Sequence, residues 1–80
     1  MRIKEAIVLR FQQLCAERKI KYNELATLSG VTPSTVYSMM NESRKDLSVI
    51  TVKKLCDGLD ISISDFFDDP IFHRLEQEIR

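Results

Sequence analysis

Apolar side chains recur at helical spacing along most of the chain. Between residues 3 and 18 they are separated by four, four and three positions, at Ile3, Ile7, Phe11 and Leu14. The same kind of pattern recurs over about 49–58, at Val52, Leu55, Cys56 and Leu59, with Ser48 placed to cap its start. No segment alternates with period two for long enough to predict a strand. The pattern therefore predicts an all-α fold.

Two shorter helices are predicted between these, over about 22–29 and 33–40, with a tight turn between them. Leu25, Ala26 and Leu28 form the apolar stripe of the first, and Val36 with Met39 or Met40 that of the second. Gly30 suits the reversal because it lacks a Cβ. Thr32 can cap the second helix, and Pro33 fits its first position. This arrangement is a helix-turn-helix, which presents its second helix to the major groove of DNA.

The remainder of the chain is predicted to be a polar loop over 41–47 and two further helices. Ser62 and Asp65 have the spacing of a capping box that opens a short helix, in which Phe66 and Phe67 are buried. Asp69 and Pro70 are a second start signal, followed by an amphipathic C-terminal helix. We therefore divide the chain into a helix-turn-helix domain, 1–68, and a C-terminal helix, 69–80, as a possible dimerisation element.

Charge is distributed unevenly although the chain is neutral overall, with 12 basic and 12 acidic residues among its 80. Residues 1–54 hold ten Lys and Arg and five Asp and Glu, whereas residues 55–80 hold two and seven. This asymmetry is consistent with one end that faces phosphate, although chance variation in a short chain is the alternative. No apolar run is long enough to span a membrane, so we expect a cytoplasmic protein.

Catalytic, metal and cofactor chemistry finds little support in the sequence. Cys15 and Cys56 lie inside helical patterns and are expected to be reduced core residues. His73 is the only histidine and is expected on the surface. Gly30 and Gly58 are too few for a nucleotide-binding loop. We expect no enzyme, no cofactor, no metal and no small-molecule ligand.

The chain from Ile20 to Phe67 resembles the lambda-repressor-like, Xre/Cro family of helix-turn-helix regulators. The matching segments are Asn-Glu-Leu-Ala (23–26), Ser-Gly-Val-Thr (29–32), Ser-Thr-Val (34–36), Thr-Val-Lys-Lys-Leu-Cys (51–56) and Leu-Asp-Ile-Ser-Ile-Ser-Asp-Phe-Phe (59–67). The resemblance implies five α-helices around one core and a transcriptional regulator that binds operator DNA as a dimer. The chain departs from the family pattern at Pro33, Met40, Glu42 and Asp60.

Base-contact candidates lie on the face of the 33–40 helix opposite its apolar stripe, and at its N-terminal end. They are Thr32, Ser34, Thr35, Tyr37 and Ser38. No Arg, Lys, Gln or Asn occupies the first two turns, so a bidentate contact to guanine or adenine is not expected. DNA shape, water bridges and thymine methyl groups are expected to carry more of the discrimination.

Phosphate-contact candidates flank this helix on both sides. Lys21 and Tyr22 open the preceding helix, whose free N–H groups favour an anion. Asn41, Ser43, Arg44 and Lys45 follow in the loop that the family uses against DNA.

The C-terminal apolar stripe offers a dimer interface, with Ile71, Phe72, Leu75 and Ile79 as candidates. The alternative is that these side chains fold back on the first or fifth helix of their own chain. A different function also stays open, namely a helical protein-interaction module or an antitoxin-like partner protein with weak or no DNA binding.

Overall fold

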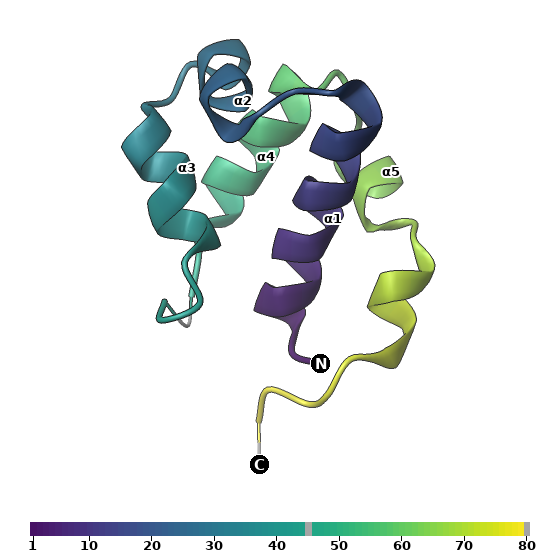
Figure 1. The fold of residues 1–80 in the computed structure, drawn as a ribbon. Helices are drawn as coiled ribbons and strands as arrows, with labels where there is room; N and C mark the ends of the chain where they lie inside the picture. Colours follow the sequence, from purple (N-terminus) through teal and green to yellow (C-terminus); the bar gives the residue numbers. More distant parts are fainter. Residues whose placement is uncertain (45, 80) are drawn as a thin grey trace.

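The protein is all-helical in the computed structural model, which describes residues 1–44 and 46–79 (Figure 1). Over these residues there are five α-helices, one 3-10 helix and no strand. The elements are α1 (Ile3–Arg18), α2 (Tyr22–Ser29), α3 (Pro33–Met40), α4 (Val49–Gly58), α5 (Ile63–Phe67) and η1 (Pro70–Arg74). The predicted all-α fold with five helices is confirmed.

Local capping explains where the helices begin. The hydroxyl groups of Thr32, Ser48 and Ser62 each accept a hydrogen bond from the backbone N–H three residues later, at 3.3, 3.3 and 3.0 Å. These bonds satisfy donors that the first turn of a helix leaves free. Gly30 ends α2 with a φ of 70°, in the left-handed region that glycine adopts without steric cost. The predicted caps at Thr32, Ser48 and Ser62 and the predicted helix end at Gly30 are confirmed.

One hydrophobic core joins the five α-helices. Each helix contributes at least one side chain with 0% exposure, namely Phe11, Leu25, Val36, Leu55 and Phe66. The rings of Phe11 and Phe66 are 4.5 Å apart, so α1 and α5 meet directly. Burial of each such side chain contributes about 1.5–3 kcal/mol. The buried side chains therefore determine which face of each helix packs in the core and which face is left to solvent.

The contact between α2 and α4 depends on a glycine. A Cβ on Gly58 would lie 2.1 Å from the Ser29 hydroxyl and 3.0 Å from the Ser29 Cα, so the two helices approach too closely for any side chain there. The buried face of α2 consequently runs through Leu25, Ala26 and the hydroxyl of Ser29. The prediction that Leu28 belongs to this face is wrong, because Leu28 is 58% exposed.

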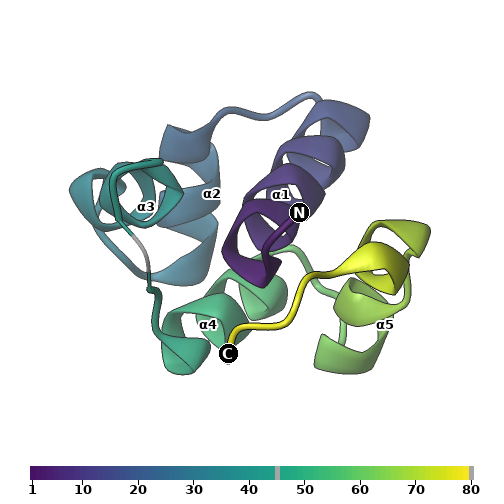
Figure 2. The ribbon, with the colours of Figure 1, turned by 90° about the horizontal axis from the view of Figure 1, so that it is seen from below.

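The helices are arranged in two groups around α1. Figures 1 and 2 show α2 and α3 on one side of α1, and α5 with η1 on its other side. α2 packs against both α3 and α4, which carries α3 to the edge of the molecule. The outer face of α3 is therefore left uncovered by the rest of the described chain.

The structure corrects the prediction for residues 69–80. In place of an amphipathic α-helix, only Pro70–Arg74 are helical, as a 3-10 helix, and residues 75–79 have no regular secondary structure. Tertiary contacts outweigh the helical pattern here. The Phe72 ring packs 4.9 Å from Phe67 and 5.9 Å from Phe66, and the Glu76 N–H donates to the Met1 carbonyl at 3.0 Å.

The apolar residues of this segment, predicted as dimer contacts, are mostly covered by their own chain. Ile71, Phe72 and Leu75 are half-buried, and Phe72 packs against the core. Ile79 is 81% exposed. The described arrangement thus favours the fold-back alternative for three of the four residues.

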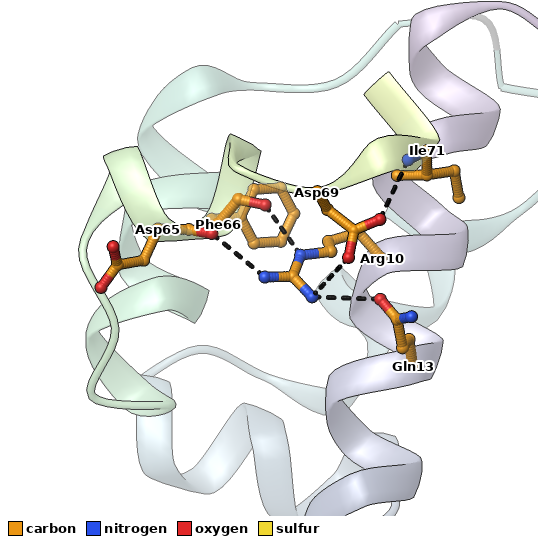
Figure 3. A network of polar contacts seen from close by, with 6 residues as sticks. All are labelled: Arg10, Gln13, Asp65, Phe66, Asp69 and Ile71. Atoms are coloured by element: carbon orange, nitrogen blue, oxygen red, sulfur yellow. Dashed lines mark hydrogen bonds and ion pairs between the residues drawn. The ribbon is translucent and has the colours of Figure 1, made fainter. Parts of the chain in front are cut away.

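Arg10 fastens the C-terminal third to α1 (Figure 3). Its guanidinium group donates to the carbonyl oxygens of Phe66 at 2.8 Å and Asp65 at 3.0 Å, and pairs with the Asp69 carboxylate at 3.3 Å. It also donates to the Gln13 side chain at 3.0 Å. The side chains of Arg10 and Asp69 are only 13% and 18% exposed, so this ion pair is largely shielded from water.

Replacing Arg10 should destabilise the protein markedly. We expect Arg10→Gln to lower the free energy of unfolding by about 2–3 kcal/mol, because it removes the countercharge of the largely shielded Asp69 and the guanidinium donors to the Phe66 and Asp65 carbonyl groups. Urea denaturation followed by circular dichroism measures this. Arg18→Gln removes the same charge from an exposed position of α1 and should change stability by less than about 0.5 kcal/mol. Equal effects of the two substitutions would contradict the role given to Arg10.

Candidate nucleic-acid interface

The inner face of α3 is anchored by three buried side chains. Val36 is fully buried, and Met39 and Met40 are 7% and 9% exposed. These positions leave the opposite face of the helix, which carries Ser34 and Tyr37, pointing outward. The outward face takes no part in the core, so it is available for a partner.

A cluster of hydroxyl groups marks the start of α3. The Thr32 Oγ1 lies 3.1 Å from the Ser34 Oγ and 2.9 Å from the Thr35 Oγ1, and all three residues are exposed. Each hydroxyl can donate or accept, so these bonds can be exchanged for bonds to water or to the edge of a base.

An open groove of about 590 Å³ lies between α3 and the segment that leads into α4. One side is formed by Ser34, Thr35, Ser38 and Met39 of α3, and the other by Arg44, Asp46, Leu47, Ser48 and Thr51. Three of the five base-contact candidates and one phosphate-contact candidate are thus brought together in one place.

Tyr37 lies apart from this groove and turns toward α2. Its hydroxyl donates to the Asn23 side chain at 2.9 Å, and its ring meets the Tyr22 ring edge-on at 5.5 Å. Tyr37 is still 52% exposed. The side chain therefore links α2 to α3 and also contributes to the outward surface.

The start of α2 presents one exposed cation. Lys21 is the N-cap residue and is exposed, and its side chain makes no capping bond. The Tyr22 hydroxyl, in contrast, is buried, and burial raises the pKa of this phenol above its usual value. In this conformation Tyr22 can offer an anion only its backbone N–H at the helix start.

The loop after α3 is a compact turn organised by Asn41. The Asn41 side-chain oxygen accepts from the N–H and from the hydroxyl of Ser43, both at 2.9 Å. The Arg44 N–H donates to the Asn41 carbonyl at 3.1 Å. These bonds set the start of the Arg44 side chain, which is exposed beside the groove. Lys45, the remaining phosphate-contact candidate, lies outside the described residues.

Sequence reasoning missed several residues near this surface, among them Asp46 and Leu47 of the groove. Lys4 of α1 donates from its Nζ to the Asn41 carbonyl at 2.5 Å, across the molecule. Ser48 was assigned only a capping role, and Thr51 none, yet both line the groove. Spacing along the chain could have placed Ser48 and Thr51 beside the loop, but Lys4 carries no sequence signal of its contact with Asn41.

Comparison with known proteins agrees with this geometry. A second helix anchored on one face, with a polar outer face beside a loop that carries the exposed Arg44, is typical of a helix-turn-helix DNA-binding domain. The family model of the Cro/C1-type HTH DNA-binding domain matches residues 10–70. The chain belongs to this family, and the resemblance found in its sequence is confirmed.

A solved structure extends the likeness to nearly the whole chain. The crystal structure of the prophage Lp1 protein 11 is 32% identical, covers 94% of this chain and 100% of that chain, and superposes with a TM-score of 0.80. No curated protein matches the chain at a comparable level.

Two other kinds of site are without support in the described residues. In residues 1–44 and 46–79, no group of three or more His, Cys, Asp or Glu side chains could hold a metal ion. In the same ranges, none of the helices has the length and apolar content needed to cross a bilayer. Burial raises the pKa of the Cys56 thiol to about 11, although Lys53 partly opposes this, so the thiol stays protonated.

Proposed function

We propose that this DNA-binding regulator recognises a specific double-stranded operator with α3 in the major groove. The observation that carries the proposal is the hydroxyl-bearing face formed by the exposed Ser34 and Thr35 and the half-buried Ser38, held on a helix with three buried anchors. A helix presented in this way can enter the groove with its N-terminal end toward the bases.

The chemistry of this face favours readout by small groups. Ser and Thr hydroxyls can bond to any base edge, and the Thr35 methyl group can contact a thymine methyl. Bidentate recognition needs a guanidinium or an amide, and the first two turns of α3 carry neither. Discrimination therefore depends on thymine methyls, bridging waters and the shape of the duplex.

Phosphate contacts fix the orientation of the domain on the duplex. We assign them to Lys21 and the backbone of Tyr22 on one side of α3, and to Asn41, Ser43, Arg44 and Lys45 on the other. Lys21 and Arg44 are exposed and separated along the chain by the whole helix-turn-helix, which supports contacts on both sides of one groove.

Two copies on a palindromic operator complete the proposal. A single α3 covers one half-site, and a two-fold axis places two such helices one duplex turn apart, at about 34 Å. Since Ile71, Phe72 and Leu75 are half-buried in their own chain, the exposed Ile79 is the remaining part of the interface predicted from the sequence.

Charge on the outer face of α3 should abolish specific binding. After selection of an operator from random duplexes, we expect Ser34→Glu or Ser38→Glu to weaken binding at least about 30-fold, or about 2 kcal/mol, because a carboxylate then faces the duplex. Fluorescence anisotropy measures the affinity. Ser64→Glu in α5 adds the same charge at an exposed position and should leave most of the binding intact. Operator binding that survives both α3 substitutions would rule out α3 as the helix that reads the bases. Absence of binding in the parent protein would favour the protein-interaction module.

Loss of a phosphate contact should weaken binding to every sequence. We expect Arg44→Gln and Lys21→Gln each to reduce the slope of log affinity against log salt by about one unit, on operator and on bulk duplex alike. Arg74→Gln is the matched control, because η1 lies on the side of α1 away from α3 (Figure 1). If Arg74→Gln reduced the salt slope as much as Arg44→Gln, duplex binding would depend only on the net charge of the protein and not on the assigned phosphate contacts.

Spacing of the half-sites tests the homodimer. Inserting about 5 base pairs between them turns one half-site to the opposite side of the duplex and should weaken binding at least about tenfold, whereas about 10 inserted base pairs should restore the facing of the two helices. Titration should give two chains per parent operator. One chain per duplex and indifference to spacing would rule the dimer out.

A further inference from the structure

The C-terminal segment lies across the start of α1. We define the C-terminal clasp as residues 75–79, which follow η1 and pass the N-terminal end of α1 (Figures 1 and 2). The Arg2 guanidinium pairs with the Glu78 carboxylate at 3.2 Å and donates to the Gln77 carbonyl at 3.3 Å. The Ile3 N–H donates to Glu78 at 3.3 Å. Carboxylates of the acidic end thus occupy the basic end of α1.

The same end of α1 is tied to the candidate interface. Two residues after Arg2, the Lys4 ammonium donates to the Asn41 carbonyl, in the turn that carries Ser43 and Arg44. A cation on the first turn of α1 therefore sits beside the loop assigned to phosphate contact. Arg2 precedes Lys4 by two residues, and in the free protein its guanidinium group is paired with Glu78.

The contacts of the clasp are weak enough to be exchanged. The Arg2 and Glu78 side chains are 41% and 51% exposed, and pairs in such a setting are readily screened by salt. Residues 75–79 have no helix or strand to hold them. A duplex offers one negative charge for about every 1.7 Å of its length, so it competes strongly for an exposed guanidinium.

We infer that the clasp is an autoinhibitory contact: Glu78 holds Arg2 away from DNA, and duplex binding releases it. Glu76 helps to keep the clasp in place, because its carboxylate pairs with the Met1 ammonium at 3.1 Å. The inference rests on the proposed function, because it concerns access of phosphate to that interface. The clasp lowers nonspecific affinity in the free protein, since each binding event must first break the Arg2–Glu78 pair. Arg2 then becomes a further phosphate contact.

Neutral variants of the clasp test this without shortening the chain. In Glu76→Gln/Glu78→Gln the amide oxygen at position 78 can still accept from the Ile3 N–H, so the start of α1 keeps its bond while the charges are lost. The matched control is Asp60→Asn/Asp68→Asn, which removes two exposed charges, next to α4 and α5. Asn is tolerated at position 60, where φ is 57°.

The readout is the salt dependence of binding to bulk duplex, measured by anisotropy. We expect the clasp variant to bind more tightly at low salt and to have a slope about one unit steeper than that of the control. A fourfold rise in salt should then cost it about 3.5-fold more affinity. In the parent protein Arg2→Gln should leave the slope unchanged, whereas in the clasp variant it should remove the extra unit.

Two results overturn the inference. One is a clasp variant whose slope and affinity equal those of the Asp60→Asn/Asp68→Asn control. The other is an Arg2→Gln substitution that already flattens the slope in the parent protein, which would mean that Glu78 does not withhold Arg2. If Arg44→Gln still flattens the slope in either case, the proposed function survives and only the clasp fails. If no variant binds duplex, both fail.

Release of the clasp can also be observed directly. Amide signals of Gln77, Glu78 and Ile79 in nuclear magnetic resonance spectra should move to random-coil positions when the parent protein is saturated with duplex. The Ile3 amide should shift with them, because it loses its acceptor. Signals of the clasp that stay in place while those of α3 shift would show that DNA binds without displacing it.

Discussion

The C-terminal third of the structure depends on the hydrogen bonds and the ion pair made by the Arg10 guanidinium group. The five residues of α5 are too few to be stable alone, and the last carbonyl groups of a helix have no partner within it. Arg10 supplies donors to two of these carbonyls and a countercharge to Asp69. The other Asp69 oxygen then accepts from the Ile71 N–H at 3.0 Å and so starts η1. One side chain of α1 thereby fixes both the end of α5 and the beginning of the next element.

The helix-turn-helix side of the molecule is held by different means. α2 and α3 rely on apolar contacts, on the close approach at Gly58 and on local backbone features such as Gly30 and the Thr32 cap. None of these uses the outward side chains of α3. Ser34, Thr35 and Ser38 can therefore differ between relatives at little cost to stability, which allows one fold to serve many operators. Thr32 and Tyr37 are exceptions, because Thr32 caps α3 and Tyr37 links it to α2.

Sequence analysis predicted the parts of this structure that are determined locally. The bounds of the first four helices, the caps at Thr32, Ser48 and Ser62 and the turn at Gly30 all follow from residues within one or two helical turns. It failed where distant residues decide. The stripe of Ile71, Phe72 and Leu75 has helical spacing, but the Phe72 ring packs against Phe66 and Phe67, and only Pro70–Arg74 are helical, as a 3-10 helix. Arg10 bonds to residues that lie 55 to 59 positions further along the chain, and Lys4 to one that lies 37 positions away. No pattern along the sequence indicates these contacts.

The folded arrangement also explains how a neutral chain can serve a DNA-binding fold. The acidic residues of the C-terminal third are partly used within the molecule, where Asp69 faces Arg10 and Glu78 faces Arg2. Lys21 at the start of α2 and Arg44 beside the groove take no part in these two ion pairs and are exposed. Interactions between exposed charges fade beyond a Debye length of about 8–10 Å at physiological salt, so the duplex responds to the local cations rather than to the net charge. Overall neutrality is therefore compatible with phosphate binding, because α5, with Asp65 and the flanking Asp68 and Asp69, lies on the side of α1 away from α3 (Figure 1).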